Sequence, residues 1–159
     1  MRKIRFANAS LGIALLLPTG SASVAQVPVA PLPSQLLTAK KLFISNTGRG
    51  FDSSAWTGGH DRIYNQFYVA MKSWGRYELV SAPGDADLVM DVNVVHDYVA
   101  LELQLEILDP KTGIVLWTHY EGIKIAVSQK NRDQNLDDTV YKLAADLKTL
   151  TAQPTTGPN

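Results

Sequence analysis

The residues from which a metal or catalytic site would be built are three histidines and several carboxylates. His60, His96 and His119 lie far apart, and none has the His-x-x-x-His or His-x-His spacing that puts two imidazoles on one face. His96 stands next to Asp97 and close to Asp91, but adjacent polar residues at the end of a hairpin are usually solvated. Neighbours on a strand also point to opposite faces. We therefore expect no metal site.

Other chemistries find equally little support. Glu102 and Glu106 share a strand face with Gln104 between them, which is typical of a solvated surface rather than of a glycosidase pair. The glycines of Gly48-Arg-Gly50 precede the next helix by about ten residues, too far for its N-terminus to hold a pyrophosphate. A P-loop, a Gly-x-Ser-x-Gly elbow and cysteine are absent. We expect no catalytic residue and no cofactor.

The segment from Asn46 to Gly59 is the most distinctive feature for binding. It is longer than most connections in compact domains. It holds Arg49, Phe51 and Trp56, and arginine and aromatic residues are enriched in binding interfaces. Two interpretations remain open: these side chains bind a partner, so that Trp56→Ala leaves stability almost unchanged, or the aromatics cover the core. The candidate binding residues are Arg49, Phe51, Trp56 and His60.

Hydrophobic periodicity predicts the elements that position this loop. Apolar residues at spacings of three and four predict helices at about 60–74 and again after residue 131 or 135, where an asparagine would form the N-cap. Gly75 stands where a helix C′ glycine belongs. Strands are predicted at 41–45, 77–81, 88–95, 101–107 and 114–120, the last continuing to 127 across a bulge at Gly122. In 88–95 and 101–107, apolar and polar residues alternate.

The third and fourth of these strands form a hairpin with one apolar face. Pairing around Asp97-Tyr98 sets residue 94 against 101, 92 against 103, 90 against 105 and 88 against 107. The opposite face is polar, and we expect it to meet water or a partner; it carries Asp91, Asn93, Glu102, Gln104 and Glu106. A turn follows at Asp109-Pro-Lys-Thr-Gly113, after which the inward face of the next strand stays undecided.

The order strand, helix, four strands, helix predicts an α+β fold. With one apolar face on each helix and on the sheet, the economical arrangement is a two-layer sandwich, with a mainly antiparallel sheet and two helices on one side. The predicted divisions are a signal peptide at 1–25, a proline-rich extended spacer at 26–37, a single domain at 38–151 and a disordered tail at 152–159.

The first 25 residues have the features of a secretory signal. Basic residues at positions 2, 3 and 5 precede the apolar run 11–17, and small residues follow, with cleavage expected after Ala25. Without this segment the chain has three more acidic than basic residues, which disfavours nucleic-acid binding. Because cysteine is absent, we expect no lipid anchor. The expected location is the periplasm or the medium.

Two motifs resemble a known group of proteins. Ala86-Asp87-Leu88 begins a strand, and Asp109-Pro-Lys-Thr-Gly-Ile-Val-Leu-Trp117 makes a turn and begins another. This pattern is similar to that of small exported envelope domains related to the TolB N-terminal domain. The resemblance implies a non-enzymatic domain that binds an envelope protein or a cell-wall component. The alternative is a small extracytoplasmic hydrolase, which should have a deep polar pocket rather than an exposed binding surface.

Overall fold

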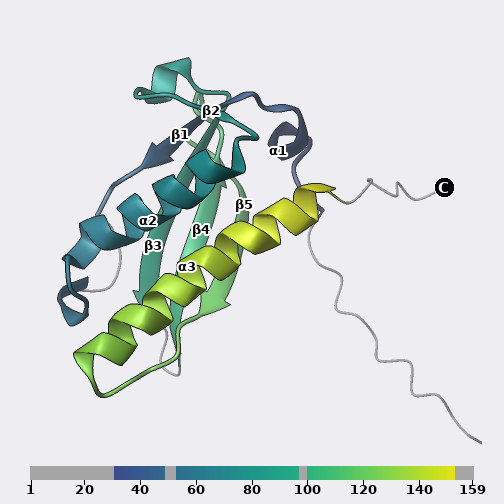
Figure 1. Ribbon diagram of the computed structural model, residues 1–159. Coiled ribbons are helices and arrows are strands. Elements are labelled where there is room, and N and C mark those ends of the chain that lie inside the picture. Colours follow the sequence, from purple (N-terminus) through teal and green to yellow (C-terminus); the bar gives the residue numbers. More distant parts are fainter. Residues whose placement is uncertain (1–30, 49–52, 97–99, 153–159) are drawn as a thin grey trace, which may run out of the picture.

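A five-stranded sheet and helices on one of its faces make up the part of the chain that the computed structural model describes, residues 31–48, 53–96 and 100–152 (Figure 1). The predicted two-layer α+β sandwich is therefore confirmed. The predicted signal peptide, the last residues of the predicted tail, Arg49 and Phe51 lie outside the described residues. Within the described part, no helix combines the length and the apolar character needed to span a bilayer.

The sheet has the order β2-β1-β3-β4-β5. Its strands are β1 (Lys41–Ser45), β2 (Glu78–Leu79), β3 (Leu88–His96), β4 (Leu101–Leu108) and β5 (Val115–Gly122). β1 runs parallel to β2 and to β3, whereas β3, β4 and β5 are successively antiparallel. The parallel pairs arise because a helix connects β1 to β2, and the antiparallel pairs because short turns connect the later strands.

Two long helices, α2 (Gly59–Trp74) and α3 (Gln129–Ala152), lie side by side across one face of the sheet (Figure 1). Gly75 ends α2 with φ of 69°, as predicted. The predicted caps of α3 are wrong, since Asn131 and Asn135 both lie inside the helix. Ser128 precedes it, and its hydroxyl accepts a hydrogen bond from the Asn131 N–H at 3.3 Å.

The extended spacer predicted for 26–37 does not extend to its expected end. A short helix, α1 (Ser34–Thr38), begins directly after Pro33, the last proline of that stretch, and Leu36 is fully buried. The hydroxyl of the buried Tyr77 donates to the Leu36 carbonyl at 2.7 Å. This contact fixes a segment whose composition predicted only a linker.

The predicted faces of the β3–β4 hairpin are correct, but its register is displaced by two residues. Val94 pairs with Leu103, and Val92 with Leu105, because four residues, 97–100, separate the strands instead of two. A displacement by two leaves every side chain on its original face, since the side-chain period of a strand is two. The core-facing residues Leu103, Leu105 and Ile107 are fully buried.

The polar face of the sheet differs from the prediction at its centre. Asp91 is 1% exposed and Asn93 4% exposed, whereas both were expected to face outward and meet water or a partner. They stand on the central strand β3, between neighbours on both sides, and the Thr47 hydroxyl lies 3.0 and 3.2 Å from the two Asp91 carboxylate oxygens. On β4, Gln104 is half-buried and donates to the Tyr120 hydroxyl at 3.0 Å.

The structure shows which face of β5 is inward. Its register is interrupted between Ile107 and Leu108, and beyond this irregularity Trp117 pairs with Ile107 and is buried in the core. The strand ends at Gly122, so the predicted continuation to residue 127 is wrong. The Ile123 N–H still donates to the Leu101 carbonyl at 2.8 Å, after which the chain leaves the sheet toward α3.

Candidate functional site

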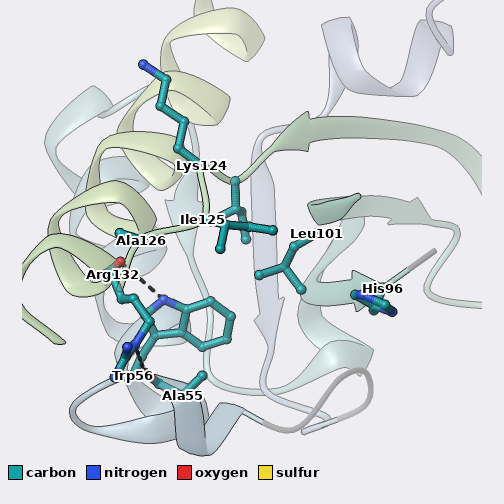
Figure 2. A pocket seen from close by; sticks show the side chains of 9 residues that line it. Ala55, Trp56, His96, Leu101, Lys124, Ile125, Ala126 and Arg132 are labelled. Atoms are coloured by element: carbon teal, nitrogen blue, oxygen red, sulfur yellow. Dashed lines mark hydrogen bonds between the residues drawn. The ribbon is translucent and has the colours of Figure 1, made fainter. Parts of the chain in front are cut away.

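An apolar pocket of 240 Å³ opens at the end of the sheet where β3 ends and β4 begins (Figure 2). It is built by four segments that are distant in sequence: the loop before α2, the two ends of the β3–β4 hairpin, the connection between β5 and α3, and the first turn of α3. The lining residues are Ala55, Trp56, His96, Leu101, Ile123, Lys124, Ile125, Ala126 and Arg132. We call this the end pocket.

Trp56 connects the end pocket to the core. Its side chain is 4% exposed and belongs to the core, although it follows a surface turn, the 3-10 segment Ser53–Ala55. The indole N–H donates to the Arg132 carbonyl at 3.2 Å, as Figure 2 shows. Such a bond is what a buried indole requires, since an unpaired N–H would be costly. Trp56 therefore both covers the core and forms a wall of the pocket.

The side chain of Arg132 holds three of these segments together. Its Nε donates to the Ala55 carbonyl at 3.1 Å, and its two terminal nitrogens donate to the Val127 carbonyl and to the side chain of Gln129. The planar guanidinium suits this task because it offers several donors in a rigid arrangement. The loop before α2 and the connection before α3 are thus fixed relative to each other.

Asp133 and Asp137 add two further ties between the loop, α2 and α3. The Thr57 N–H donates to Asp133 Oδ1 at 2.9 Å, and this bond to the charged form lowers the pKa of Asp133. Arg62 on α2 binds Asp137 through Nε at 2.8 Å and Nη2 at 2.7 Å, and this pairing raises the pKa of Arg62. Gln66 also donates to Asp137.

The connection 123–127 presents apolar side chains from a fixed backbone. Asn135 donates to the Lys124 carbonyl at 2.8 Å, and Arg132 holds the Val127 carbonyl. Nevertheless, Ile125 is 81% exposed and Val127 is 97% exposed. Exposed apolar groups beside an apolar cavity are typical of an interaction site. This arrangement can bind apolar groups, with Lys124 supplying a positive charge nearby.

Of the two predicted binding residues that the structure describes, Trp56 and His60, one lies at the pocket. Trp56 lines it, Arg49 and Phe51 lie outside the described residues, and His60 is half-buried at the start of α2, where it is not part of the lining. Ile125, which lines the pocket, was not predicted as a binding residue. The apolar residues after Gly122 were a signal, but their alternation was interpreted as a continuing strand.

The chain is similar to known proteins in its fold. No protein-family model matches the chain, and no curated protein matches it. Among solved structures it is similar to the PelC dodecamer from Paraburkholderia phytofirmans (13% identity, 72% of this chain and 89% of that chain, TM-score 0.47). It is also similar to a neuraminyllactose-binding hemagglutinin homolog from Helicobacter pylori (8% identity, 73% of this chain and 87% of that chain, TM-score 0.49). A third similar structure is a lipoprotein from Caulobacter crescentus (16% identity, 77% of this chain and 97% of that chain, TM-score 0.42).

The resemblance to TolB-like domains rests on two short motifs and stays a prediction.

Proposed function

We propose that this chain is an exported, non-enzymatic binding module of the bacterial cell envelope, and that its end pocket receives an apolar segment of a partner protein. One observation carries the proposal: the apolar pocket lies beside Ile125 and Val127, whose side chains are 81% and 97% exposed on a backbone held by hydrogen bonds. The location rests on the signal-like sequence of residues 1–25.

The size and lining of the pocket favour a peptide side chain as occupant. At 240 Å³ it is smaller than most cavities that enclose a whole small molecule, which measure about 300–1,000 Å³. Burying one large aliphatic or aromatic side chain contributes about 1.5–3 kcal/mol. A cell-wall glycan offers mainly polar groups and would gain less from an apolar lining.

The lining also bears on the alternative, a hydrolase. Hydrolysis requires polar groups that converge on the reacting bond. In the end pocket the polar side chains are His96, Lys124 and Arg132, and the guanidinium of Arg132 is already bonded to three oxygens of the protein. This pattern supports binding over catalysis as the role of the pocket.

A matched pair of surface variants tests the proposal. Ile125→Glu places a charge at the pocket, and Val69→Glu places one on α2 at a residue that is 57% exposed and not part of the pocket lining. The free energy of unfolding of both variants should lie within about 0.5 kcal/mol of that of wild type, as is usual for substitutions at exposed positions.

The partner is first identified by a photo-crosslinking residue at position 125 in cells that make the full chain, with position 69 as the matched control. Crosslinking to one protein from position 125 but not from 69 is the expected result. The affinity of that protein should then fall at least tenfold for Ile125→Glu, a loss of about 1.4 kcal/mol, and stay unchanged for Val69→Glu. Equal losses, or no crosslink from position 125, would refute the proposal.

A further inference from the structure

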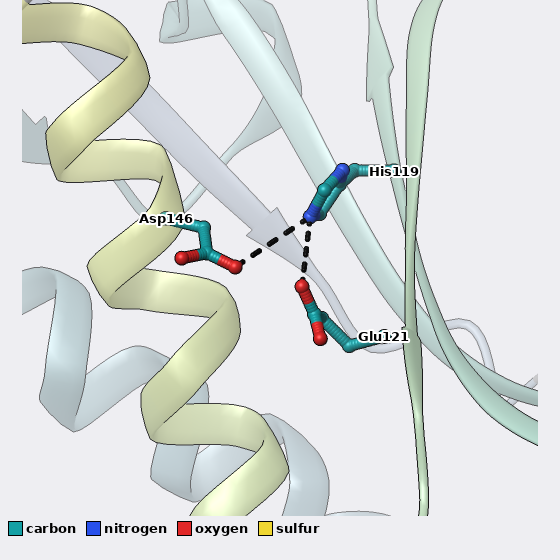
Figure 3. A group of neighbouring side chains, drawn as sticks. All are labelled: His119, Glu121 and Asp146. Carbon is teal, nitrogen blue, oxygen red and sulfur yellow. Dashed lines mark hydrogen bonds and ion pairs between the residues drawn. The ribbon is translucent and has the colours of Figure 1, made fainter. Parts of the chain in front are cut away.

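A second cluster of polar side chains joins β5 to α3 and shares no residue with the end pocket (Figure 3). His119 Nε2 lies 3.1 Å from Glu121 Oε1 and 3.9 Å from Asp146 Oδ2. One ligand atom from each of these three residues lies within 4.8 Å of the others. A nitrogen and two carboxylate oxygens therefore lie close enough together to be ligands of one ion.

The fold holds these side chains in place. His119 and Glu121 are two residues apart on β5, so they point to the same face, toward α3. The imidazole stacks on the buried ring of Trp117, with 5.4 Å between centroids and 3° between planes. Asp146 comes from α3, which packs against β5. The imidazole orientation is thus set by packing and does not depend on a ligand.

A lysine already provides the positive charge that the two carboxylates attract. The Lys142 ammonium contacts Glu121 Oε2 and lies 3.1 Å from Asp146 Oδ2. The Lys142 side chain is 60% exposed, whereas that of Glu121 is only 12% exposed. Ion pairs made by an exposed lysine contribute little to stability, so the lysine can move into solvent at little cost. Its ammonium therefore competes with a metal cation for these two carboxylates.

We propose that His119, Glu121 and Asp146 bind a zinc ion, with Lys142 displaced into solvent. Zinc accepts imidazole nitrogen and carboxylate oxygen at about 2.0–2.2 Å in a tetrahedral arrangement, which separates ligand atoms by about 3.3–3.6 Å. The two distances from His119 Nε2, 3.1 and 3.9 Å, lie on either side of this range. Two carboxylates balance the charge of the ion, and three protein ligands leave a fourth position for water.

Zinc binding by the purified, metal-free protein tests the proposal. Isothermal titration with Zn²⁺ should give one site per chain, and His119→Ala should weaken it at least tenfold. The matched control is His60→Ala, which removes a histidine that belongs neither to this cluster nor to the lining of the end pocket and should bind zinc as wild type does. Co²⁺ provides a second probe, because four-coordinate Co²⁺ absorbs visible light more strongly than the six-coordinate ion in water. His119→Ala should lose these visible absorption bands.

The Lys142→Ala variant distinguishes a metal site from a network of ion pairs that binds no metal. If the lysine competes with the metal, its removal should tighten zinc binding several-fold. Zinc should also raise the melting temperature of wild type and of Lys142→Ala, but not of His119→Ala, because a ligand that binds only the folded state stabilises it. Zinc binding that is equal in wild type and His119→Ala, or that is weakened by Lys142→Ala, would overturn the proposal.

Discussion

Replacing Trp56 is the sharpest test of how the end pocket is built. The side chain is 4% exposed and lies in the core, so Trp56→Ala removes a large buried ring and should cost about 3–5 kcal/mol. Trp56→Phe keeps an aromatic ring but loses the bond to the Arg132 carbonyl. The lost bond accounts for about 0.5–1.5 kcal/mol, and the smaller ring adds to this, so we expect a total of roughly 1–3 kcal/mol.

Urea denaturation followed by far-ultraviolet circular dichroism measures these effects without relying on the fluorescence of the mutated residue. Small proteins lose about 1–3 kcal/mol of stability per molar urea. The midpoint should therefore fall by at least about 1 M for Trp56→Ala and by less for Trp56→Phe. Ile125→Ala is the matched control, since that side chain lines the same pocket but is 81% exposed, and its midpoint should stay near that of wild type.

A Trp56→Ala variant with unchanged stability would refute this reasoning. It would mean that the ring is not part of the core in solution, and it would restore the alternative that Trp56 serves binding alone. The order of the two substitutions matters equally. If Trp56→Phe costs as much as Trp56→Ala, the hydrogen bond to the Arg132 carbonyl, and not the buried area, dominates at this position.

Two further predictions concern the sheet and its acid sensitivity. Leu103→Ala should cost about 2–5 kcal/mol because Leu103 is fully buried, whereas Gln104→Ala on the opposite face should cost under about 1.5 kcal/mol, mainly for its bond to a tyrosine hydroxyl; urea melts that rank them in the reverse order would contradict the face assignment. Asp87 accepts the N–H groups of Lys40 and Lys41 at 2.9 Å each, which lowers the pKa of its carboxyl group. A carboxyl group whose pKa is lower in the folded state stabilises the fold at any pH above its unfolded pKa of about 3.9, and this stabilisation is lost as the pH falls through the folded-state pKa. The difference in unfolding free energy between wild type and Asp87→Ala should therefore shrink between pH 7 and pH 3. A difference that stays constant would contradict this prediction.

The fold class follows from local patterns because these patterns are strong and repeated. Alternation in 88–95 and 101–107 places Leu103 and Leu105 in the core whatever the exact register is, since a displacement by two residues keeps the same face. Gly75 and Gly113 occupy the positive-φ positions that their turns predict, with φ of 69° and 68°. The apolar spacing of α2 and α3 identifies their buried faces in the same way.

The register of the β3–β4 hairpin could be determined only from the folded structure. Alternation constrains only the parity of the pairing, and the length of the connecting loop sets the actual partners. The folded structure was also needed to show that part of the polar face is buried. Asp91 and Asn93 look like solvated residues in sequence, but the central position of β3 encloses them between neighbouring strands.

The order of residue types along short stretches was enough to predict the two long helices, the five strands, their apolar faces, the sandwich architecture and export, because each of these depends on a local pattern. The two candidate sites follow only from the folded structure. The end pocket joins Trp56 to Arg132, and the polar cluster joins His119 to Asp146. These partners lie on different elements, and only the packing of α3 against the end and the edge of the sheet brings them within reach.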